Sequence, residues 1–302
     1  MRILLTGGAG FIGSHISRKY IEDGHEVLIV DNLSSGKEEN IPPGARFEKY
    51  DIRDSAGMKK IFSSFKPELV NHHAAQIDVR VSAENPALDA DINITGSLNL
   101  LSLCAERGTG KFIFASSGAV YGEVARPPAG EDAEPNPQSP YGTAKLCVEH
   151  YLRFFKSHHG VDFTALRYSN VYGERQDTEK KTGIVAILCG NHKKGAQTTV
   201  FGSGGQTRDY VHCSDVARAN ALCASKPGGI FNISTGVETS VNKITDILSA
   251  VSGKKVKVKR TGAKKGDVGA IFLDNSLAAK KLGWKPEVGI EDGISDFWKS
   301  LN

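Results

Sequence analysis

A glycine-rich turn between a predicted strand and a predicted helix constrains the fold of this chain more than any other feature. Its three glycines, spaced G-x-x-G-x-x-G, are Gly7, Gly10 and Gly13. The apolar run Arg2–Thr6 before them predicts a buried strand, and the apolar spacing of Phe11–Glu22 after them predicts a helix. A second apolar run, Glu26–Asp31, ends in a carboxylate. Together these segments predict a strand–helix–strand unit with parallel strands.

The turn has the properties of a binding site for the diphosphate of a dinucleotide. Glycines allow a tight turn, a close approach of backbone to phosphate, and close packing of helix on strand. The helix that follows presents unpaired N–H groups to the phosphates. Asp31 is placed to accept hydrogen bonds from adenosine ribose hydroxyls, and its charge disfavours a 2′-phosphate, so we expect NAD rather than NADP. Lys37 could meet such a phosphate, but a solvated loop position is the simpler interpretation.

Strands and helices alternate through the first half of the chain. Further strands are predicted at 46–50, 69–73, 111–115 and 162–167, and helices at 55–65, 86–106 and 139–159. This alternation predicts an α/β fold with a Rossmann-type doubly wound parallel sheet, whose ligands bind at the carboxyl ends of the strands. We predict an NAD-binding Rossmann domain at residues 1–169, with a return segment near 211–234. A smaller, interleaved substrate domain is predicted at 170–302.

Three residues predict acid/base chemistry beside the cofactor. Tyr141 and Lys145 are four residues apart in a predicted helix and share one face. A free phenol has a pKa near 10, but a neighbouring ammonium and a nicotinamide cation both favour the phenolate. Ser117 follows the predicted strand 111–115, where its hydroxyl can donate to the reacting oxygen and relay a proton to Tyr141. A packed tyrosine, a snorkelling lysine and a turn-capping serine are the structural alternatives, and the order of the three motifs favours catalysis.

Composition argues against several other classes of protein. The 302 residues carry 38 Lys and Arg against 34 Asp and Glu, a mild net charge of +4 that suits an anionic small-molecule substrate. Residues 254–265 hold most of the lysine excess without interleaved aromatics, so we expect no nucleic-acid binding. The absence of a long apolar run and of a signal pattern predicts a cytoplasmic protein without membrane contact. The five cysteines form no C-x-x-C pair and the nine histidines show no metal spacing, so no metal is expected.

Eight motifs in order extend these predictions to a family. They are TGGAGFIG at 6–13, DNLSSG at 31–36, DIRD at 51–54, HHAAQ at 72–76, FASSGAVYG at 114–122, SPYGTAK at 139–145, LRYSNVYG at 166–173 and RDYVH at 208–212. With this set the whole chain resembles the extended short-chain dehydrogenase/reductase family, and within it the UDP-glucose (UDP-galactose) 4-epimerases. The resemblance implies NAD-dependent 4-epimerisation of a UDP-hexose through a transient 4-keto sugar. It also implies a homodimer that pairs through the long helices near 86–106 and 141–159.

The resemblance assigns roles to individual residues. The implied catalytic residues are Ser117, Tyr141 and Lys145. The implied cofactor-binding residues are Gly7, Gly10, Phe11, Ile12, Gly13, Asp31, Asn32, Ser35, Gly36, Asp51, Ile52, Ala74, Ala75, Gln76, Asn93, Ser116, Tyr141, Lys145 and Tyr168. The implied substrate-binding residues are Ser117, Tyr141, Asn170, Val200, Phe201, Arg208, Lys264 and Asp267.

Departures from the family pattern leave the identity of the substrate's sugar undetermined. Lys264 stands where relatives usually have an arginine, and lysine supplies charge to a diphosphate without the bidentate fork. Ile271 occupies a position that tunes the room around the C2 substituent, so N-acetylhexosamines remain alternatives. Gly118-Ala119 stands where nucleotide-sugar 4,6-dehydratases carry an Asp-Glu pair and UDP-glucuronate decarboxylases a glutamate. UDP-glucuronate 4-epimerases need only the same trio, whereas a non-catalytic NAD-sensing protein would not need the Tyr-Lys pair.

Overall fold

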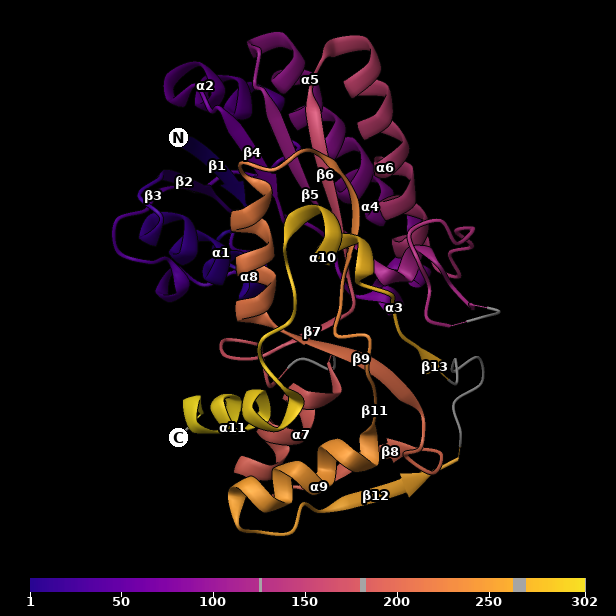
Figure 1. Cartoon of the computed structure of the whole chain (residues 1–302). Coiled ribbons are helices and arrows are strands. Elements are labelled where there is room, and N and C mark those ends of the chain that lie inside the picture. The colour runs from indigo at the N-terminus through magenta and orange to yellow at the C-terminus, as the bar shows by residue number, and fades with distance from the viewer. Residues whose placement is uncertain (125–126, 180–182, 263–269, 302) are drawn as a thin grey trace.

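A seven-stranded sheet of parallel strands organises the larger part of the molecule (Figure 1). The computed structural model describes residues 1–124, 127–179, 183–262 and 270–301. The strand order is β10-β6-β5-β4-β1-β2-β3, and it reverses between β1 and β4. The strands are β1 (Arg2–Thr6), β2 (Glu26–Val30), β3 (Arg46–Glu48), β4 (Leu69–His72), β5 (Lys111–Ser117), β6 (Asp162–Tyr168) and β10 (Gly229–Ile233). The predicted doubly wound fold is thus confirmed, with its switch point at the carboxyl ends of β1 and β4.

Helices cover both faces of this sheet because its strands are apolar on both faces. In β1, Ile3 and Leu5 pack toward α1, α8 and α10, while Leu4 packs toward α2, α5 and α6. All three of these strand residues are fully buried. The helices are α1 (Phe11–Glu22), α2 (Ser55–Phe65), α5 (Gly96–Arg107), α6 (Pro140–His159), α8 (Cys213–Cys223) and α10 (Ser276–Leu282), and short 3-10 turns occur at η1 (Glu38–Asn40) and η3 (Gly118–Val120).

The segment predicted as one helix over 86–106 is divided in the structure. Its parts, with the helix before them, are α3 (Val79–Glu84), α4 (Pro86–Ala90), the π-helical turn η2 (Asp91–Thr95) and α5. The Asn85 side chain caps α4 by accepting from the Leu88 amide at 3.1 Å. Asn93, inside the π turn, makes two hydrogen bonds to the backbone of Gln76. The apolar spacing of the segment predicts its helical character but not the tertiary contact that accompanies the wider turn.

A smaller set of elements lies at the lower end of the molecule in Figure 1. A four-stranded sheet and a two-stranded sheet enclose a separate hydrophobic core with three helices. The elements are β7 (Asn170–Tyr172), α7 (Ile184–Lys193), β8 (Thr198–Phe201), β9 (Thr207–His212), β11 (Glu238–Ser240), α9 (Val241–Ser252), β12 (Val258–Thr261), β13 (Ala270–Ile271) and α11 (Ile290–Ser300). The lysine-rich segment forms a strand only from Val258 onward, where β12 pairs in parallel with β8. The exact domain boundary at residue 169 stays a prediction.

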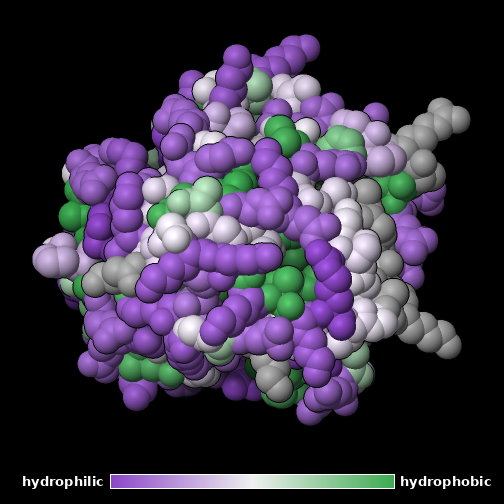
Figure 2. Space-filling model, turned by 90° about the horizontal axis from the view of Figure 1, so that it is seen from below, coloured by the Kyte–Doolittle hydropathy of each residue, from purple (hydrophilic) through white to green (hydrophobic). Residues whose placement is uncertain are grey.

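The face of the molecule seen from below is mainly polar (Figure 2). Figure 2 shows the lower end of the molecule from below, where hydrophilic side chains dominate and hydrophobic ones form small groups. None of the helices in the described ranges is long and apolar enough to cross a membrane. Within those ranges, no group of three or more His, Cys, Asp or Glu side chains is arranged to hold a metal ion. All five cysteines are free thiols.

Candidate active site

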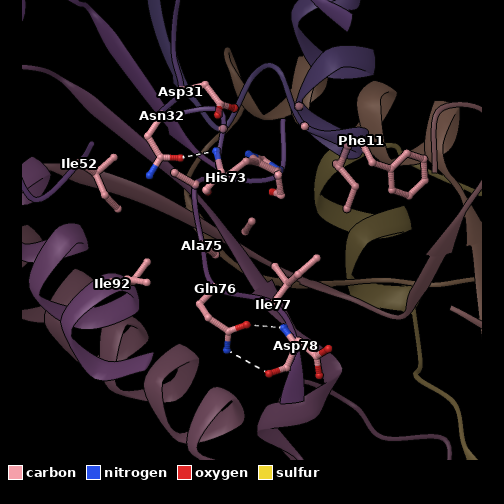
Figure 3. A pocket seen from close by; sticks show the side chains of 18 of the residues that line it. Phe11, Asp31, Asn32, Ile52, His73, Ala75, Gln76, Ile77, Asp78 and Ile92 are labelled. Atoms are coloured by element: carbon pink, nitrogen blue, oxygen red, sulfur yellow. Dashed lines mark hydrogen bonds between the residues drawn. The ribbon is translucent and has the colours of Figure 1, made fainter. Parts of the chain in front are cut away.

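A cavity of about 670 Å³ opens at the carboxyl ends of the strands around the switch point. Figure 3 shows Asp31 at one end of this cavity and Asp78 at the other. Of the residues predicted to bind the cofactor, all but Gly36 and Asn93 line this cavity. Those that line it are Gly7, Gly10, Phe11, Ile12, Gly13, Asp31, Asn32, Ser35, Asp51, Ile52, Ala74, Ala75, Gln76, Ser116, Tyr141, Lys145 and Tyr168. The lining also includes residues that the sequence did not single out, namely Val30, Ser34, Tyr50, His73, Ile77, Asp78, Arg80, Ile92 and Ala115.

The glycine turn leaves no room for side chains where the cofactor would lie. Gly7 has a φ of +71°, and a Cβ on it would come within 2.6 Å of the Ala74 amide nitrogen. A Cβ on Gly13 would come within 2.2 Å of the Gly7 carbonyl oxygen. Gly10 occupies the N-cap of α1 and supplies no side-chain cap, so the first N–H groups of the helix stay available for an anion. This cradle fits the diphosphate of a dinucleotide.

Asp31 lies at the end of β2 and is only 7% exposed. Its carboxylate accepts hydrogen bonds from the backbone amides of Ala9 at 3.1 Å and Leu33 at 2.8 Å. Burial raises the pKa of this carboxyl, and the two amides act in the opposite direction. A Cβ on Gly36 would come within 2.9 Å of the same carboxylate, which explains the glycine there although Gly36 does not line the cavity. Asp31 therefore holds the loop that would surround the adenosine ribose.

Asp51 forms the opposite wall of this end of the cavity. Its carboxylate accepts from the Asn32 amide at 2.9 Å and from two nitrogens of the Arg53 guanidinium at 2.9 and 2.8 Å. These charge-assisted hydrogen bonds with Arg53 hold the pKa of Asp51 well below its usual range. Ile52 is 5% exposed and packs under α5 against Gly96. The cavity wall at the predicted adenine position is thus partly apolar and rigidly held.

The three predicted catalytic residues come together at the junction of β5 and α6. Tyr141 lies in the first turn of α6, which begins where the Ser139 hydroxyl accepts from the Gly142 amide at 3.1 Å. Lys145 is one turn further on, with Nζ 5.6 Å from the centroid of the Tyr141 ring. Ser117 ends β5, where its hydroxyl accepts from the Ala119 amide at 3.1 Å and lies near enough to Tyr141 to favour the ionised phenol and lower its pKa. A serine, a tyrosine and a lysine in this arrangement can hold a substrate hydroxyl and move its proton.

Burial dominates the ionisation of this trio. It raises the pKa of Tyr141 to about 12, and the nearby Ser117 side chain only partly offsets the effect. Burial also lowers the pKa of Lys145 to about 8. The sequence predicts that the ammonium and a bound nicotinamide cation lower the pKa of the tyrosine, and in the protein without cofactor desolvation shifts this pKa the other way. A cationic nicotinamide beside the phenol would favour its ionised form.

A buried ion pair between Glu149 and Arg167 lies beside the catalytic residues and was not predicted from the sequence. Glu149 lies on the same face of α6 as Tyr141 and Lys145, at four-residue spacing, and it is fully buried. Its carboxylate accepts from Arg167 of β6 at 2.9 and 2.6 Å and from the hydroxyl of Ser116 at 2.6 Å. The Ser116 hydroxyl is therefore committed to Glu149, although the residue lines the cavity. Two sequence signals could have indicated this pair. Glu149 is four residues after Lys145, and Arg167 lies inside a largely apolar strand.

Tyr168 and His73 form a second polar connection at the cavity wall. The Nε2 atom of His73 lies 3.0 Å from the Tyr168 hydroxyl, and the two rings stack. Asn220 of α8 donates to the same hydroxyl at 2.8 Å. Burial lowers the pKa of His73 to about 3, so the ring is neutral at physiological pH. The partners of Tyr168 lie far apart in sequence, which is why the sequence predicts the residue but not its hydrogen bonds.

The predicted substrate-binding residues of the C-terminal part are not brought together in the same way. Asn170 donates to the Asp209 carbonyl at 3.1 Å, and Arg208 donates to the Thr207 carbonyl at 2.7 Å. Val200 is 3% exposed, and its side chain packs in the core of the smaller part, whereas Phe201 is 46% exposed. None of these four described residues lines the cavity. Lys264 and Asp267 lie outside the described residues.

Comparisons with known proteins agree with this geometry. The chain matches the model of the NAD dependent epimerase/dehydratase family over residues 3–234. A UDP-glucose 4-epimerase of Thermotoga maritima, solved with UDP-glucose, is 45% identical, with a TM-score of 0.97 over 100% of this chain and 98% of that one. A UDP-glucose 4-epimerase of Thermus thermophilus, solved with NAD, is 40% identical, with a TM-score of 0.94 over 100% and 99% of the two chains.

A third solved structure has a different sugar in its name. It is a UDP-N-acetylglucosamine 4-epimerase of Methanobrevibacter ruminantium, in complex with UDP-N-acetylmuramic acid. It is 34% identical, with a TM-score of 0.94 over 99% of this chain and 97% of that one. The family match and these likenesses confirm the predicted resemblance and the predicted use of NAD. The chain belongs to the NAD-dependent epimerase/dehydratase family.

Proposed function

We propose that this protein is an NAD-dependent UDP-sugar 4-epimerase whose substrate is a UDP-hexose, UDP-glucose or UDP-galactose. The observation that carries the proposal is the placement of Tyr141 and Lys145 in the wall of a cavity shaped for a dinucleotide, with Ser117 nearby at the end of β5. Two similar structures bear the name UDP-glucose 4-epimerase, and one of them was solved with UDP-glucose. This supports the choice of hexose.

The residues divide the chemistry between them. Ser117 holds the 4-hydroxyl of the sugar, and Tyr141 takes its proton and later returns it to the 4-keto oxygen. Lys145 keeps a positive charge beside the phenolate, which favours the ionised tyrosine. The cofactor, when bound, accepts hydride from C4 and gives it back. Epimerisation follows if the 4-keto sugar turns over between the two transfers, held by its diphosphate, for which Arg208 offers a guanidinium fork.

The turn after Ser117 favours epimerisation over dehydration. A dehydratase needs an acid and a base to remove the C5 proton and to protonate the leaving hydroxyl. Gly118 and Ala119 supply neither, and they lie in the 3-10 turn η3 directly after the catalytic strand. A Cβ on Gly118 would come within 3.2 Å of Leu273 and 3.4 Å of the Tyr168 carbonyl. An acidic side chain would therefore be crowded at this position.

Turnover in heavy water tests this choice of reaction. An epimerase moves one hydride away from C4 and back, so the product should be the C4 epimer without carbon-bound deuterium. A dehydratase must exchange the C5 proton with solvent, so its product would carry deuterium and lack one water. Mass spectrometry of the product from a UDP-hexose separates the two results. Deuterium at C5 together with loss of water would contradict the proposed epimerase.

The same assay decides the sugar when it is run with a panel. UDP-glucuronate and UDP-N-acetylhexosamine remain alternatives, because the trio is sufficient for either and one similar structure is named for an N-acetylated sugar. The side chain of Ile271, which the resemblance places near the C2 substituent, lies outside the described part of the structure. We expect the highest kcat/KM with UDP-glucose or UDP-galactose. A higher value with either alternative would reassign the substrate and leave the reaction unchanged.

We further propose that the protein is a homodimer through α4 and α6. Leu88 on α4 and Tyr151 and Phe154 on α6 are exposed at 38%, 38% and 46%, an unusual set of large apolar side chains on helices that pack against each other. A second copy of the same surface would cover them. Sedimentation should give about twice the chain mass of 32.4 kDa. Phe154→Lys should then give monomers, whereas Val237→Lys at another exposed apolar residue should not.

A further inference from the structure

Asp89 is a buried carboxylate that the proposed reaction does not use. It lies on α4, which packs against α6, and it is 1% exposed. Its Oδ1 atom accepts from the Gln76 side-chain amide at 2.8 Å and from the Asn93 side-chain amide at 3.0 Å. Its Oδ2 atom is buried and has no hydrogen-bond partner among the described residues. Burial of a half-satisfied carboxylate is costly, so a role for its charge is expected.

The carboxylate is held in place by the π-helical turn η2. Asn93 in this turn accepts from the Gln76 backbone amide at 2.9 Å and donates to the Gln76 carbonyl at 3.0 Å. The Gln76 side chain in turn makes hydrogen bonds with the backbone of Asp78, as Figure 3 shows. Gln76 lines the cavity, so this clamp fixes Asp89 directly behind the cavity wall. The sequence predicted Gln76 and Asn93 as cofactor residues and gave no sign of the carboxylate that they hold.

The other charged groups around the Tyr141–Lys145 pair are paired or neutral, which leaves Asp89 as its counter-charge. Asp78 and Arg80 line the same cavity and form an ion pair with each other at 2.8 Å. From β4 and the loop after it, His72 and His73 are neutral, because burial holds both pKa values well below the ordinary range. On α6 itself, the Glu149 carboxylate is neutralised by the guanidinium of Arg167. Lys145 is 4% exposed, and its Nζ atom lies 4.8 Å from the centroid of the Phe114 ring. Burial lowers the pKa of Lys145 and raises that of Tyr141, and from α4 the negative charge of Asp89 opposes the first effect and adds to the second.

We propose that Asp89 is a positioning residue that acts as the fixed counter-charge of the Tyr141–Lys145 pair and keeps the Lys145 ammonium protonated. The proposal rests on the proposed function only for the acid/base roles of these two residues. An ammonium without a counter-charge would lose its proton to burial. A carboxylate in direct contact would instead draw the ammonium away from the tyrosine. Gln76 and Asn93 prevent this by holding the carboxylate back on α4 while its field still reaches the pair.

The sign of the effect follows from the charge. Removing a negative charge favours loss of protons, so both ionisation steps of the coupled pair move to lower pH in Asp89→Asn. We expect the pH profile of kcat, and the formation of tyrosinate in the NAD-loaded protein, to shift to lower pH by roughly one unit, a usual size for a nearby charge. The asparagine should fit, because its amide oxygen can accept from Gln76 and Asn93. Its amide nitrogen would take the place of Oδ2, which has no donor facing it among the described residues.

The experiment is a spectroscopic pH titration of the NAD-loaded enzyme. Tyrosinate absorption is recorded against pH for the wild type, Asp89→Asn and Tyr141→Phe, and the difference from Tyr141→Phe isolates the signal of Tyr141. The pH profile of kcat with a UDP-hexose is measured in parallel. Glu84→Gln is the matched control, since it removes an exposed carboxylate from the adjacent helix α3 and should leave both curves unchanged. Asp89→Glu keeps the charge and should return the curves toward the wild type.

The outcomes separate this proposal from the proposed function. A protein that turns over no UDP-hexose but shows the shifted tyrosinate titration would contradict the function and support the counter-charge. Superimposable titrations of Asp89→Asn and the wild type would overturn the counter-charge. If Asp89→Asn does not fold, Asp89→Ala with added formate takes its place, and a wild-type curve restored by formate supports the proposal. If neither variant folds with NAD bound, Asp89 is a structural residue and the proposal is wrong.

Discussion

Tyr141→Phe is expected to lower turnover by about 10²–10⁴-fold, the usual contribution of a general acid/base residue, while NAD stays bound. Only the hydroxyl is removed, and the ring that lies beside the Lys145 ammonium remains. Without the phenol, no group at this position can take the proton of the 4-hydroxyl as hydride leaves C4. Turnover with a UDP-hexose and the NAD released on denaturation are the two measurements. Loss of activity with normal NAD content would place Tyr141 in the chemistry.

Tyr151→Phe is the matched control for this experiment. It is the same substitution on the same helix, at a residue that is 38% exposed and does not line the cavity. It should keep wild-type turnover and NAD content. Near-normal turnover of Tyr141→Phe would remove this residue from the mechanism. A parallel loss of NAD would show instead that the substitution disturbs the cofactor site.

The parts of the structure that depend on local sequence were predictable. Gly7 and Gly13 could be predicted because a glycine turn between a strand and a helix has few physical explanations, and the structure shows that a Cβ at either would clash. Tyr141 and Lys145 could be placed on one helix face because helical periodicity alone determines their relation. The carboxyl end of the sheet then follows from the alternation of strands and helices.

The parts that depend on tertiary contacts were not predictable. The apolar spacing over 86–106 is continuous, so nothing in it indicates the π turn that faces Asn93 toward Gln76. In the sequence, Asp89 resembles an ordinary exposed carboxylate of a helix. In the structure it is buried on α4, which packs against α6. The pKa of Tyr141 in the protein without cofactor depends on tertiary structure in the same way, because the sequence shows the neighbouring ammonium but not the depth of burial. All three features depend on the packing of segments that are distant in the sequence.

Glu149→Gln is expected to lower the free energy of unfolding by about 3–5 kcal/mol, the usual cost of breaking a buried ion pair from one side. Arg167 is 1% exposed, so its charge would be left in the interior without a compensating carboxylate. The amide oxygen of glutamine can still accept from Ser116 and from Arg167 Nε, as Oε1 does, but the amide nitrogen cannot accept from Arg167 Nη2, as Oε2 does. Equilibrium unfolding in urea, followed by circular dichroism at neutral pH, gives the free energy.

An exposed ion pair between the same two elements provides the control. Asp162 at the start of β6 pairs with Lys156 near the end of α6 at 2.8 Å, and their side chains are 36% and 51% exposed. Asp162→Asn should cost about 1 kcal/mol or less, because water screens exposed charges and solvates whichever partner is left alone. Replacing both members of the buried pair, as Glu149→Gln with Arg167→Met, should recover part of the lost stability because no unpaired charge remains. If Glu149→Gln costs no more than Asp162→Asn, the buried pair does not anchor the helix that carries Tyr141 and Lys145, and their placement must depend on the packing of α6 alone.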